Sequence, residues 1–291
     1  MTDAITAYHA RMLRVLDHID RHLDDTLDLE TLAGVAAFSK HHFHRQFSAL
    51  LGIGVSRYVQ LLRMKRAAYR LAYRETPVTE IALDTGYEAP ESFTRAFRTM
   101  FGQAPGEFRK LPAWESWLQA CGPLANPRSF QMTTPTPDQV EIVTTDAASV
   151  AVLTHRGDPA RIGDTIQRFI AWRRATGLTP KVSATYNIFH SDPATTAPED
   201  YRLDLCAATD RPVAPNDDGV VPGEIPAGRA ARLTITGSSD DLGPAADWLY
   251  REWLPASGEE PRDFPFYCRR VSFFPDVPEH EAVTELYLPL A

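Results

Sequence analysis

The sequence is poor in cysteine and has no long apolar run. Its three cysteines are odd in number, lie far apart and form no C-x-x-C pair. This argues against a disulfide framework and favours a reduced, cytoplasmic setting. No apolar run approaches the roughly 18 residues that a membrane span needs, so no membrane partner is expected. The first residues, MTDAITAYHARML, lack the basic and then apolar layout of a signal peptide.

Acidic residues are missing from one stretch of the chain. Residues 31–74 contain none and carry eight lysines and arginines. Residues 1–110 hold 15 lysines and arginines against 13 acids, a net charge of +2 in a chain whose total is -8. Six of the nine histidines also fall there. A basic segment in an acidic protein is typical of a domain that binds a polyanion; the alternative is a basic helix face that only solvent contacts.

The first third of the chain shows helical periodicity throughout. Asp28 and Ser39 are placed to cap two short helices. A longer helix is expected over about residues 56–73. Pro77 suits the first turn of another short helix, and a last pair is expected between residues 91 and 110.

This helical region contains an internal repeat. Eight positions of a first copy match eight positions of a second copy further along the chain. The first three pairs are separated by the same number of residues, and the other five pairs by one residue more. The extra residue therefore falls in the turn between the two short helices of the second copy. Each copy has a short helix, a tight turn and a second helix, which is the helix-turn-helix layout. The matched pairs are Leu32/Ile81, Ala33/Ala82, Phe38/Tyr87, Phe43/Phe93, Arg45/Arg95, Phe47/Phe97, Gly52/Gly102 and Tyr58/Phe108.

The stretch SKHHFHRQF, residues 39–47, opens the second helix of the first copy. Its two phenylalanines lie four residues apart and must face the core, so His41, His44 and Arg45 share the solvent face. No cysteine or acid lies nearby to complete a zinc shell, and no nucleophile is presented for catalysis. We therefore expect no metal, no cofactor and no catalytic residue here, but an exposed face that either contacts a partner or faces only solvent.

The rest of the chain has a different pattern. Residues 111–139 carry five prolines and are expected to be a linker. From Val140 onward six segments have strand character, and two helices are expected near 160–176 and 240–254. The strand segments are 150–157, 183–189, 201–209, 229–237, 264–270 and 282–290.

This second region also contains a duplication. Leu153 and Thr154 return as Leu233 and Thr234, and Asp204 corresponds to Glu285 at an offset longer by one. The sequence therefore predicts a multidomain fold. An all-α double helix-turn-helix domain occupies residues 1–110, the linker 111–139, and an α+β domain of two β-α-β-β repeats 140–291.

Two stretches, LAGVAAFSKHHFHRQF (32–47) and GYEAPESFTRAFRTMFGQAPGEFRK (86–110), together with the R-x-x-x-A pattern of Arg63–Ala67, resemble the DNA-binding domain of AraC-family transcription regulators. The resemblance implies a transcription regulator that binds double-stranded DNA, and it leaves RNA polymerase open as a further partner. It places base contacts at seven positions: His41, His44, Arg45, Pro90, Glu91, Thr94 and Arg95.

The spacing of the two copies suits a DNA duplex. A helix of about 18 residues between them spans roughly 27 Å, so with its flanking turns it could hold the two exposed faces about one DNA turn, roughly 34 Å, apart. Lys40, Arg57, Arg63 and Lys65 are expected to attract phosphates without reading sequence.

Residues 184–209, 224–237 and 279–290 resemble the GyrI-like effector-binding domain. The resemblance implies a small-molecule effector held in a cleft between the two repeats, near an acidic residue on the last strand, here Glu285. It also leaves open two alternative functions for this domain. One is a small-molecule hydrolase that uses Glu285 as general base. The other is a protein-binding inhibitor.

Strand alternation supports part of this expectation. It places Glu285 and Tyr287 on the face opposite the covering helix. Asp204 occupies the matching position in the first repeat, and Tyr186 and Tyr267 lie on nearby strands. Two acids beside aromatic rings would bind a cationic or aromatic small molecule. The alternative is that Glu285 is a solvated strand residue and the tyrosines are edge packing.

Overall fold

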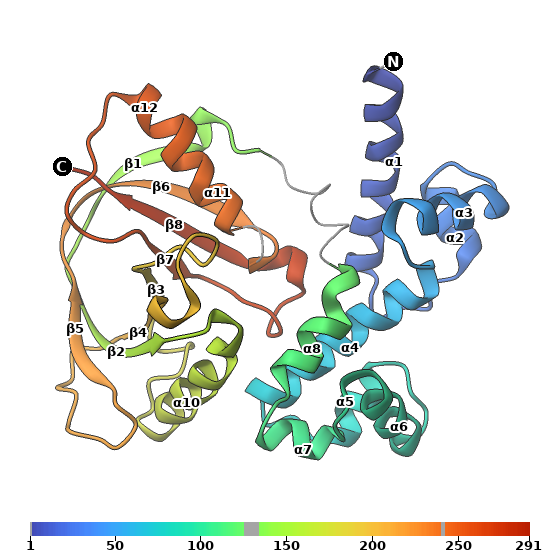
Figure 1. Cartoon of the computed structure of the whole chain (residues 1–291), viewed down its shortest axis with the longest axis horizontal. Coiled ribbons are helices and arrows are strands. Elements are labelled where there is room, and N and C mark those ends of the chain that lie inside the picture. The colour runs from blue at the N-terminus through green and yellow to red at the C-terminus, as the bar shows by residue number, and fades with distance from the viewer. Residues whose placement is uncertain (1, 125–133, 240–241) are drawn as a thin grey trace. The chain divides into compact units, whose positions relative to one another are not determined.

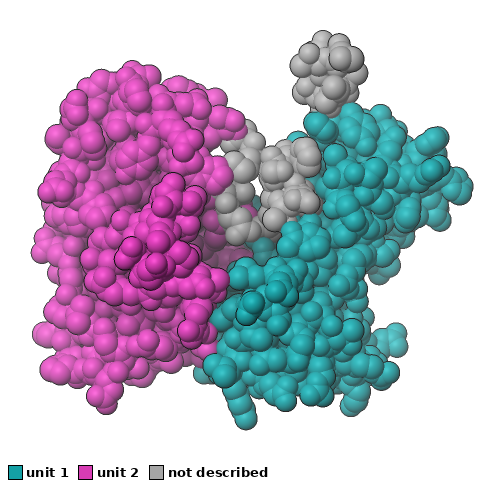
Figure 2. All heavy atoms as spheres, in the orientation of Figure 1, with its two compact units in different colours: residues 1–133, 278–280 teal, residues 134–277, 281–291 magenta. Residues whose placement is uncertain are grey.

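The computed structural model describes residues 2–124, 134–239 and 242–291 of the chain (Figure 1). The chain divides into two compact units (Figure 2). The helical unit comprises residues 1–133 and 278–280, and the sheet unit comprises residues 134–277 and 281–291. Residues 125–133 of the expected linker lie outside the described residues.

The helical unit contains two helix-turn-helix modules joined by one long helix, as the repeat predicts. The first module is defined here as residues 22–28 with α2 and α3, and the second as α5 and α6; α4 joins them. The helices are α1 (Thr2–Arg21), α2 (Leu29–Val35), α3 (Lys40–Leu51), α4 (Val55–Tyr73), α5 (Val78–Asp84), α6 (Pro90–Phe101), α7 (Pro105–Lys110) and α8 (Trp114–Cys121), followed by the 3-10 turn Gly122–Leu124.

Local signals in the sequence set where these helices begin and end. The Asp28 carboxylate accepts hydrogen bonds from the backbone N–H groups of Glu30 and Thr31, at 2.9 and 2.8 Å, and caps α2 as predicted. Ser39 caps α3 in the same way. The second helix of each module, α3 and α6, ends at a left-handed glycine, Gly52 with φ 74° and Gly102 with φ 76°.

The two modules are packed alike. The phenylalanine pairs of α3 and α6 are fully buried, at 0% exposure for Phe47 and Phe97. Phe47 meets Tyr58 edge-on with ring centroids 5.6 Å apart, and Phe97 meets Phe108 edge-on at 5.4 Å. The duplication in the sequence is therefore a duplication of core contacts.

The first part of the expected linker is helical and packs on the helical unit. Trp114 stacks on Tyr73 with ring centroids 5.6 Å apart, and Trp117 meets Tyr69 at 5.4 Å. Both tryptophans of α8 are buried. Proline limits the regular structure to this short helix because α8 lies between Pro112 and Pro123.

The sheet unit is built on one antiparallel sheet of eight strands, in the order β1-β6-β8-β7-β3-β4-β2-β5. Each of the six predicted segments overlaps one observed strand, and β2 and β6 begin one or two residues earlier than predicted. The strands are β1 (Val140–Thr145), β2 (Ala148–Arg156), β3 (Thr185–Phe189), β4 (Arg202–Ala208), β5 (Val221–Ile225), β6 (Gly228–Thr236), β7 (Tyr267–Arg270) and β8 (Val283–Pro289).

The prediction missed β1 and β5, the two edges of the sheet. β1 has no buried residue and β5 has only one, so they lack the buried and exposed alternation that a half-buried strand shows. β5 also contains Pro222, which has no backbone N–H to donate and therefore suits an edge strand, where no further strand needs that donor.

The two predicted β-α-β-β units are present as β2-α10-β3-β4 and β6-α11-β7-β8. Each is preceded by an edge strand that pairs with the other unit: β1 pairs with β6, and β5 pairs with β2. β3 and β7, one from each unit, pair at the centre of the sheet. This exchange of strands joins the two repeats in a single sheet.

Helices cover one face of the sheet. α10 (Ile162–Ala175) buries Phe169 and Trp172 against β2 and β4. The segment α11 (Leu242–Trp248), the π-helical turn Leu249–Trp253 and α12 (Leu254–Ser257) bury Trp248 and Trp253 against β6 and β8. Short 3-10 turns occupy Pro137–Gln139, Pro159–Arg161, Pro198–Asp200 and Glu279–Glu281. Among the described residues, no helix combines the length and the apolar character that crossing a membrane requires.

Candidate functional site

The first candidate surface is the solvent face of α3. Lys40, His41, His44 and Arg45 are all exposed, and the phenylalanines on the opposite side of the helix are buried. The helix divides as its spacing predicts, so donor-rich side chains share one outward face. Contact of these four residues with DNA stays a prediction.

The second candidate surface is the matching face of α6, in the second copy of the repeat. Glu91 and Arg95 are exposed, and Pro90 and Thr94 are partly exposed. These four residues and Arg98 line an open hollow of about 390 Å³. Arg98 was not predicted, although its position one turn beyond Thr94 and Arg95 places it on the same face. In Figure 1, α3 and α6 lie on either side of α4.

Two of the expected phosphate contacts are wrong. Arg63 donates hydrogen bonds to the backbone carbonyls of Leu23 and Asp25, at 2.9 and 2.7 Å, so its guanidinium is used inside the helical unit. Lys65 is buried, at 5% exposure. Both point inward because α4 is packed on most sides, which helical periodicity alone did not show. Arg57 remains exposed.

The histidines of α3 have no metal-binding geometry around them. Across the described ranges of the chain, no three His, Cys, Asp or Glu side chains lie close enough to hold a metal ion.

A separate candidate site, for a small molecule, lies in the sheet unit, on the face of the sheet that the helices do not cover. The rings of Tyr267 and Tyr287 are stacked, with centroids 4.9 Å apart and an interplanar angle of 1°. Tyr186 continues the group, at 6.5 Å from Tyr267. The Tyr287 hydroxyl donates a hydrogen bond to Glu285 Oε2 at 2.8 Å. Four of the five predicted ligand-site residues therefore form one continuous cluster, the tyrosine cluster.

Asp204, the fifth predicted residue, lies apart from Glu285, the acid of the tyrosine cluster. β3 and β7 separate its strand from β8, and the strand register aligns Asp204 with Tyr287 instead of Glu285, so the two acids are not neighbours. Its carboxylate accepts from Thr154 Oγ1 at 2.6 Å and Arg202 Nη2 at 3.1 Å, and lies 2.7 Å from His190 Nε2. Burial would raise the pKa of Asp204, but these hydrogen bonds outweigh it and lower the pKa.

Glu285 and Asp204 have different neighbours on the adjacent strands. Arg269 lies directly opposite Glu285 in the β7–β8 pairing, and its Nη1 is 3.7 Å from Glu285 Oε2. Arg232 Nη1 is 3.9 Å from Glu285 Oε1. The residues at the matching positions of the first repeat, near Asp204, are the aliphatic Val152 and Ile188. The repeat in the sequence contained this difference, but the prediction did not use it.

The buried groups of this face have shifted pKa values. Burial, and then the hydrogen bond to the Glu285 carboxylate, raise the pKa of the Tyr287 hydroxyl. Burial raises the pKa of Cys268 to about 11 and also raises that of Cys206. Tyr287 is thus a hydrogen-bond donor at neutral pH, and the two thiols are buried in the core.

Comparison with known proteins agrees with both resemblances. The family model of the GyrI-like small molecule binding domain matches residues 138–291, and that of a helix-turn-helix domain matches residues 32–111. The two matches together include both candidate sites.

Each of the curated relatives named here matches one part of the chain. The chain is 38% identical over 153 residues to the probable transcriptional regulator YgiV of Escherichia coli strain K12, covering 52% of this chain and 96% of YgiV. Over 102 residues it is 35% identical to the uncharacterized HTH-type transcriptional regulator YbfP of Bacillus subtilis strain 168, covering 35% of each chain. Over 99 residues it is 32% identical to the right origin-binding protein of Escherichia coli strain K12, covering 34% of each. The protein thus belongs to the family with a GyrI-like small molecule binding domain, here preceded by an AraC-type helix-turn-helix domain.

Proposed function

We propose that this protein is a transcription regulator that binds double-stranded DNA through α3 and α6 and senses a small molecule in its sheet unit. The observation that carries the DNA-binding half is the duplication. Two helices of 12 residues, at equivalent places in the repeat, each bury phenylalanines on one side and expose donor-rich side chains on the other.

The two exposed faces suit base recognition. Arg45 and Arg95 occupy equivalent positions, and each guanidinium can fork to a guanine edge or bind a phosphate. Glu91 can accept a hydrogen bond from a cytosine amine. The 19 residues of α4 extend about 28 Å, which with flanking turns suits two major grooves one duplex turn, roughly 34 Å, apart.

Selection of bound duplexes from a random DNA pool tests this half of the proposal. We expect an enriched sequence with two conserved blocks whose centres lie about one turn apart. Arg45→Ala should relax selection in one block and Arg95→Ala in the other. Enrichment of no sequence by the wild-type protein would refute sequence-specific binding.

The tyrosine cluster suits an aromatic ligand. Tyr186 and Glu285 are partly exposed, and the stacked pair of tyrosines offers ring faces and edges beside them. The charge of Glu285 is offset by Arg232 and Arg269, which lie within 4 Å of its oxygens. We therefore propose a flat aromatic effector without a full positive charge, since a cation would meet two guanidinium groups at this carboxylate.

A matched ligand pair tests this choice. A neutral heteroaromatic compound and its N-methylated quaternary cation have the same flat shape but differ in charge. Titration calorimetry should show tighter binding of the neutral compound. Tighter binding of the cation would contradict the proposal that the effector carries no full positive charge and would favour a cationic aromatic effector.

A ligand regulates DNA binding only if it favours one arrangement of the protein over another. We propose that the effector changes operator affinity, and fluorescence anisotropy with the selected DNA measures this directly. Equal affinity with and without saturating ligand would remove the sensing role while leaving the DNA-binding role intact.

We further propose that the protein acts in the cytoplasm, contacts RNA polymerase at its operators and is not an enzyme. Relatives named as transcriptional regulators support this choice over a hydrolase or a protein-binding inhibitor. Glu285 is also engaged by Tyr287 and by two guanidinium groups. Ligand recovered unchanged after long incubation would support a binding role, and turnover that requires Glu285 would overturn it.

A further inference from the structure

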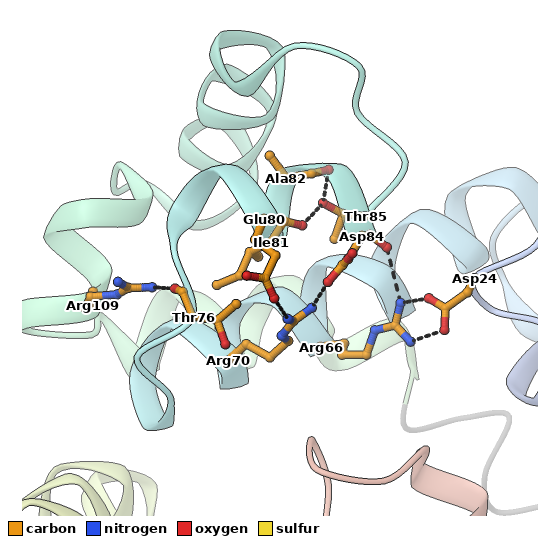
Figure 3. Close-up of polar contacts among 10 residues, drawn as sticks. All are labelled: Asp24, Arg66, Arg70, Thr76, Glu80, Ile81, Ala82, Asp84, Thr85 and Arg109. Carbon is orange, nitrogen blue, oxygen red and sulfur yellow. Dashed lines mark hydrogen bonds and ion pairs between the residues drawn. The ribbon is translucent and has the colours of Figure 1, made fainter.

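One arginine of α4 contacts both helix-turn-helix modules. The Arg66 guanidinium forks to the two carboxylate oxygens of Asp24, with Nη1 3.1 Å from Oδ2 and Nη2 bonded to Oδ1. The same Nη2 donates to the backbone carbonyl of Asp84 at 3.3 Å. Figure 3 shows Arg66 between the two aspartates. Asp24 belongs to the first module and Asp84 is the last residue of α5 in the second.

Arg63, one turn earlier on α4, lies between the same two segments. It donates to the carbonyls of Leu23 and Asp25, on either side of Asp24 in the chain. On the other side it faces Gly86: a Cβ atom at this position would lie 3.2 Å from Arg63 Nη1. Gly86 also has φ 84°, so it allows both the tight turn and the close approach of the guanidinium. The space between residues 23–25 and 84–86 is thus occupied by two guanidinium groups.

We propose that Arg66 is a positioning residue for DNA recognition, which fixes the orientation of the two modules and therefore the spacing of operator half-sites that the protein accepts. The proposal rests on the DNA-binding function proposed above. It does not require Arg66 to touch DNA. Its side chain is only 14% exposed, and its donors are directed at the two aspartates.

Removing the Arg66 side chain should change the relative orientation of the two modules more than the stability of the fold. Asp24 is 70% exposed, and ion pairs with such partners contribute little to stability in water. The modules keep their own phenylalanine cores, so each should remain folded and able to bind a half-site. What a variant of Arg66 loses is a planar fork whose two bonds fix direction as well as distance.

Arg70 provides a matched control. It lies one turn beyond Arg66 on α4, and its side chain is similarly buried, at 19% exposure. Its ion pairs join Glu80, at 3.2 Å, and Asp84, both on α5. Removing Arg70 therefore deletes comparable ion pairs but leaves the contact between the first module and α4 unchanged.

The first experiment measures module orientation without DNA. Ala49→Cys and Thr99→Cys introduce exposed cysteines at equivalent positions of α3 and α6, and the native cysteines of the described chain are buried. Spin labels at these sites report an inter-label distance distribution. We expect a narrow distribution for the parent and for Arg70→Ala, and a clearly broader one for Arg66→Ala and Asp24→Asn. An unchanged width in Arg66→Ala would overturn the proposal whether or not the protein binds DNA.

The second experiment measures spacing preference on the selected operator, with the distance between half-sites changed by one or two base pairs. We expect the wild-type protein and Arg70→Ala to bind the native spacing at least about tenfold more tightly than the altered ones. Arg66→Ala should reduce this ratio to about threefold while binding an isolated half-site like wild type. Retention of the full ratio, or an equal loss in Arg70→Ala, would overturn the proposal. Failure of the wild-type protein to bind any operator would instead refute the proposed function.

Discussion

Arg269 on β7 and Glu285 on β8 lie directly opposite each other, with Nη1 and Oε2 3.7 Å apart. The acid that strand alternation indicates as a ligand contact is therefore already beside a positive charge. Its counterpart in the first repeat, Asp204, has the aliphatic Ile188 opposite it and pairs with Arg202 of its own strand and with His190. The two acids are thus paired by arginines at different positions, and only Glu285 lies beside the stacked tyrosines, so the ligand preference is argued from the second repeat.

Removing the charge of Arg269 should shift ligand preference toward cations. In Arg269→Gln we expect binding of the quaternary aromatic cation to strengthen by about three- to tenfold, because one repulsive charge near Glu285 is lost. Binding of the neutral analogue should change little. Calorimetric titration of both ligands measures the difference, and Arg251→Gln, an exposed arginine of the π-helical turn, is the control. Equal changes for both ligands would show that Arg269 acts by shape instead of charge.

Truncation of the recognition arginines should weaken specific binding. We expect Arg45→Ala and Arg95→Ala each to cost about 1–3 kcal/mol on the selected operator and much less on unrelated DNA. Fluorescence anisotropy at a fixed salt concentration measures both. Arg211→Ala, an exposed arginine of the sheet unit, should bind like wild type. Equal losses on both DNAs would assign the arginines to phosphate contact alone.

The two modules should depend equally on their buried phenylalanines. Phe47→Ala and Phe97→Ala each remove a ring at 0% exposure, and we expect a loss of about 3–5 kcal/mol in the free energy of unfolding. Urea unfolding followed by circular dichroism measures this loss. Leu83→Ala changes a residue that is 60% exposed and should have almost no effect. A large difference between the two phenylalanines would contradict equivalent cores.

Asp204 should make stability depend on pH below its ordinary pKa. Its folded-state pKa lies below the unfolded value of 3.8, so the folded protein binds fewer protons than the unfolded chain in this range. The stabilisation is fully present above pH 3.8 and is lost as pH falls through the lowered value. Asp204→Asn should lack this part of the pH dependence, as measured by urea unfolding from mildly acidic to strongly acidic pH. The exposed Asp210→Asn is the control; identical profiles for Asp204→Asn and wild type would refute the assignment.

The native thiols should resist modification. All three cysteines are buried, and the pKa of Cys268 is raised to about 11, so little thiolate exists in mildly alkaline buffer. We expect a thiol reagent such as dithionitrobenzoate to react slowly with the folded protein and quickly with all three cysteines in denaturant. Rapid reaction of one cysteine in the folded state would reveal local opening around it.

Local features of the fold were predictable because short-range chemistry causes them. Capping by Asp28 and Ser39 requires only a side-chain oxygen near free N–H groups, and the glycines that end α3 and α6 require only a left-handed backbone. The repeat also predicted which phenylalanines are buried. The edge strands were missed because an exposed strand need not alternate.

The sequence predicted which face of a helix or strand each candidate site occupies, but not which neighbouring elements complete the site. The helical period and the alternation of a strand determine which side chains share a side. They correctly group Glu285 with Tyr287 but do not say which strand lies next to β8. Only the strand order separates Asp204 from that group and places Arg269 beside it.

The amino-acid sequence by itself determined the two duplications and the outward faces of α3 and α6, since each of these depends on spacing along one chain. The tertiary structure alone decided that Arg63 and Lys65 are turned inward, that Arg66 joins Asp24 to the Asp84 carbonyl, and that Glu285 is flanked by guanidinium groups. These contacts join side chains that are many helical turns or several strands apart in the sequence. No local period extends that far, so they become definite only when packing brings the segments together.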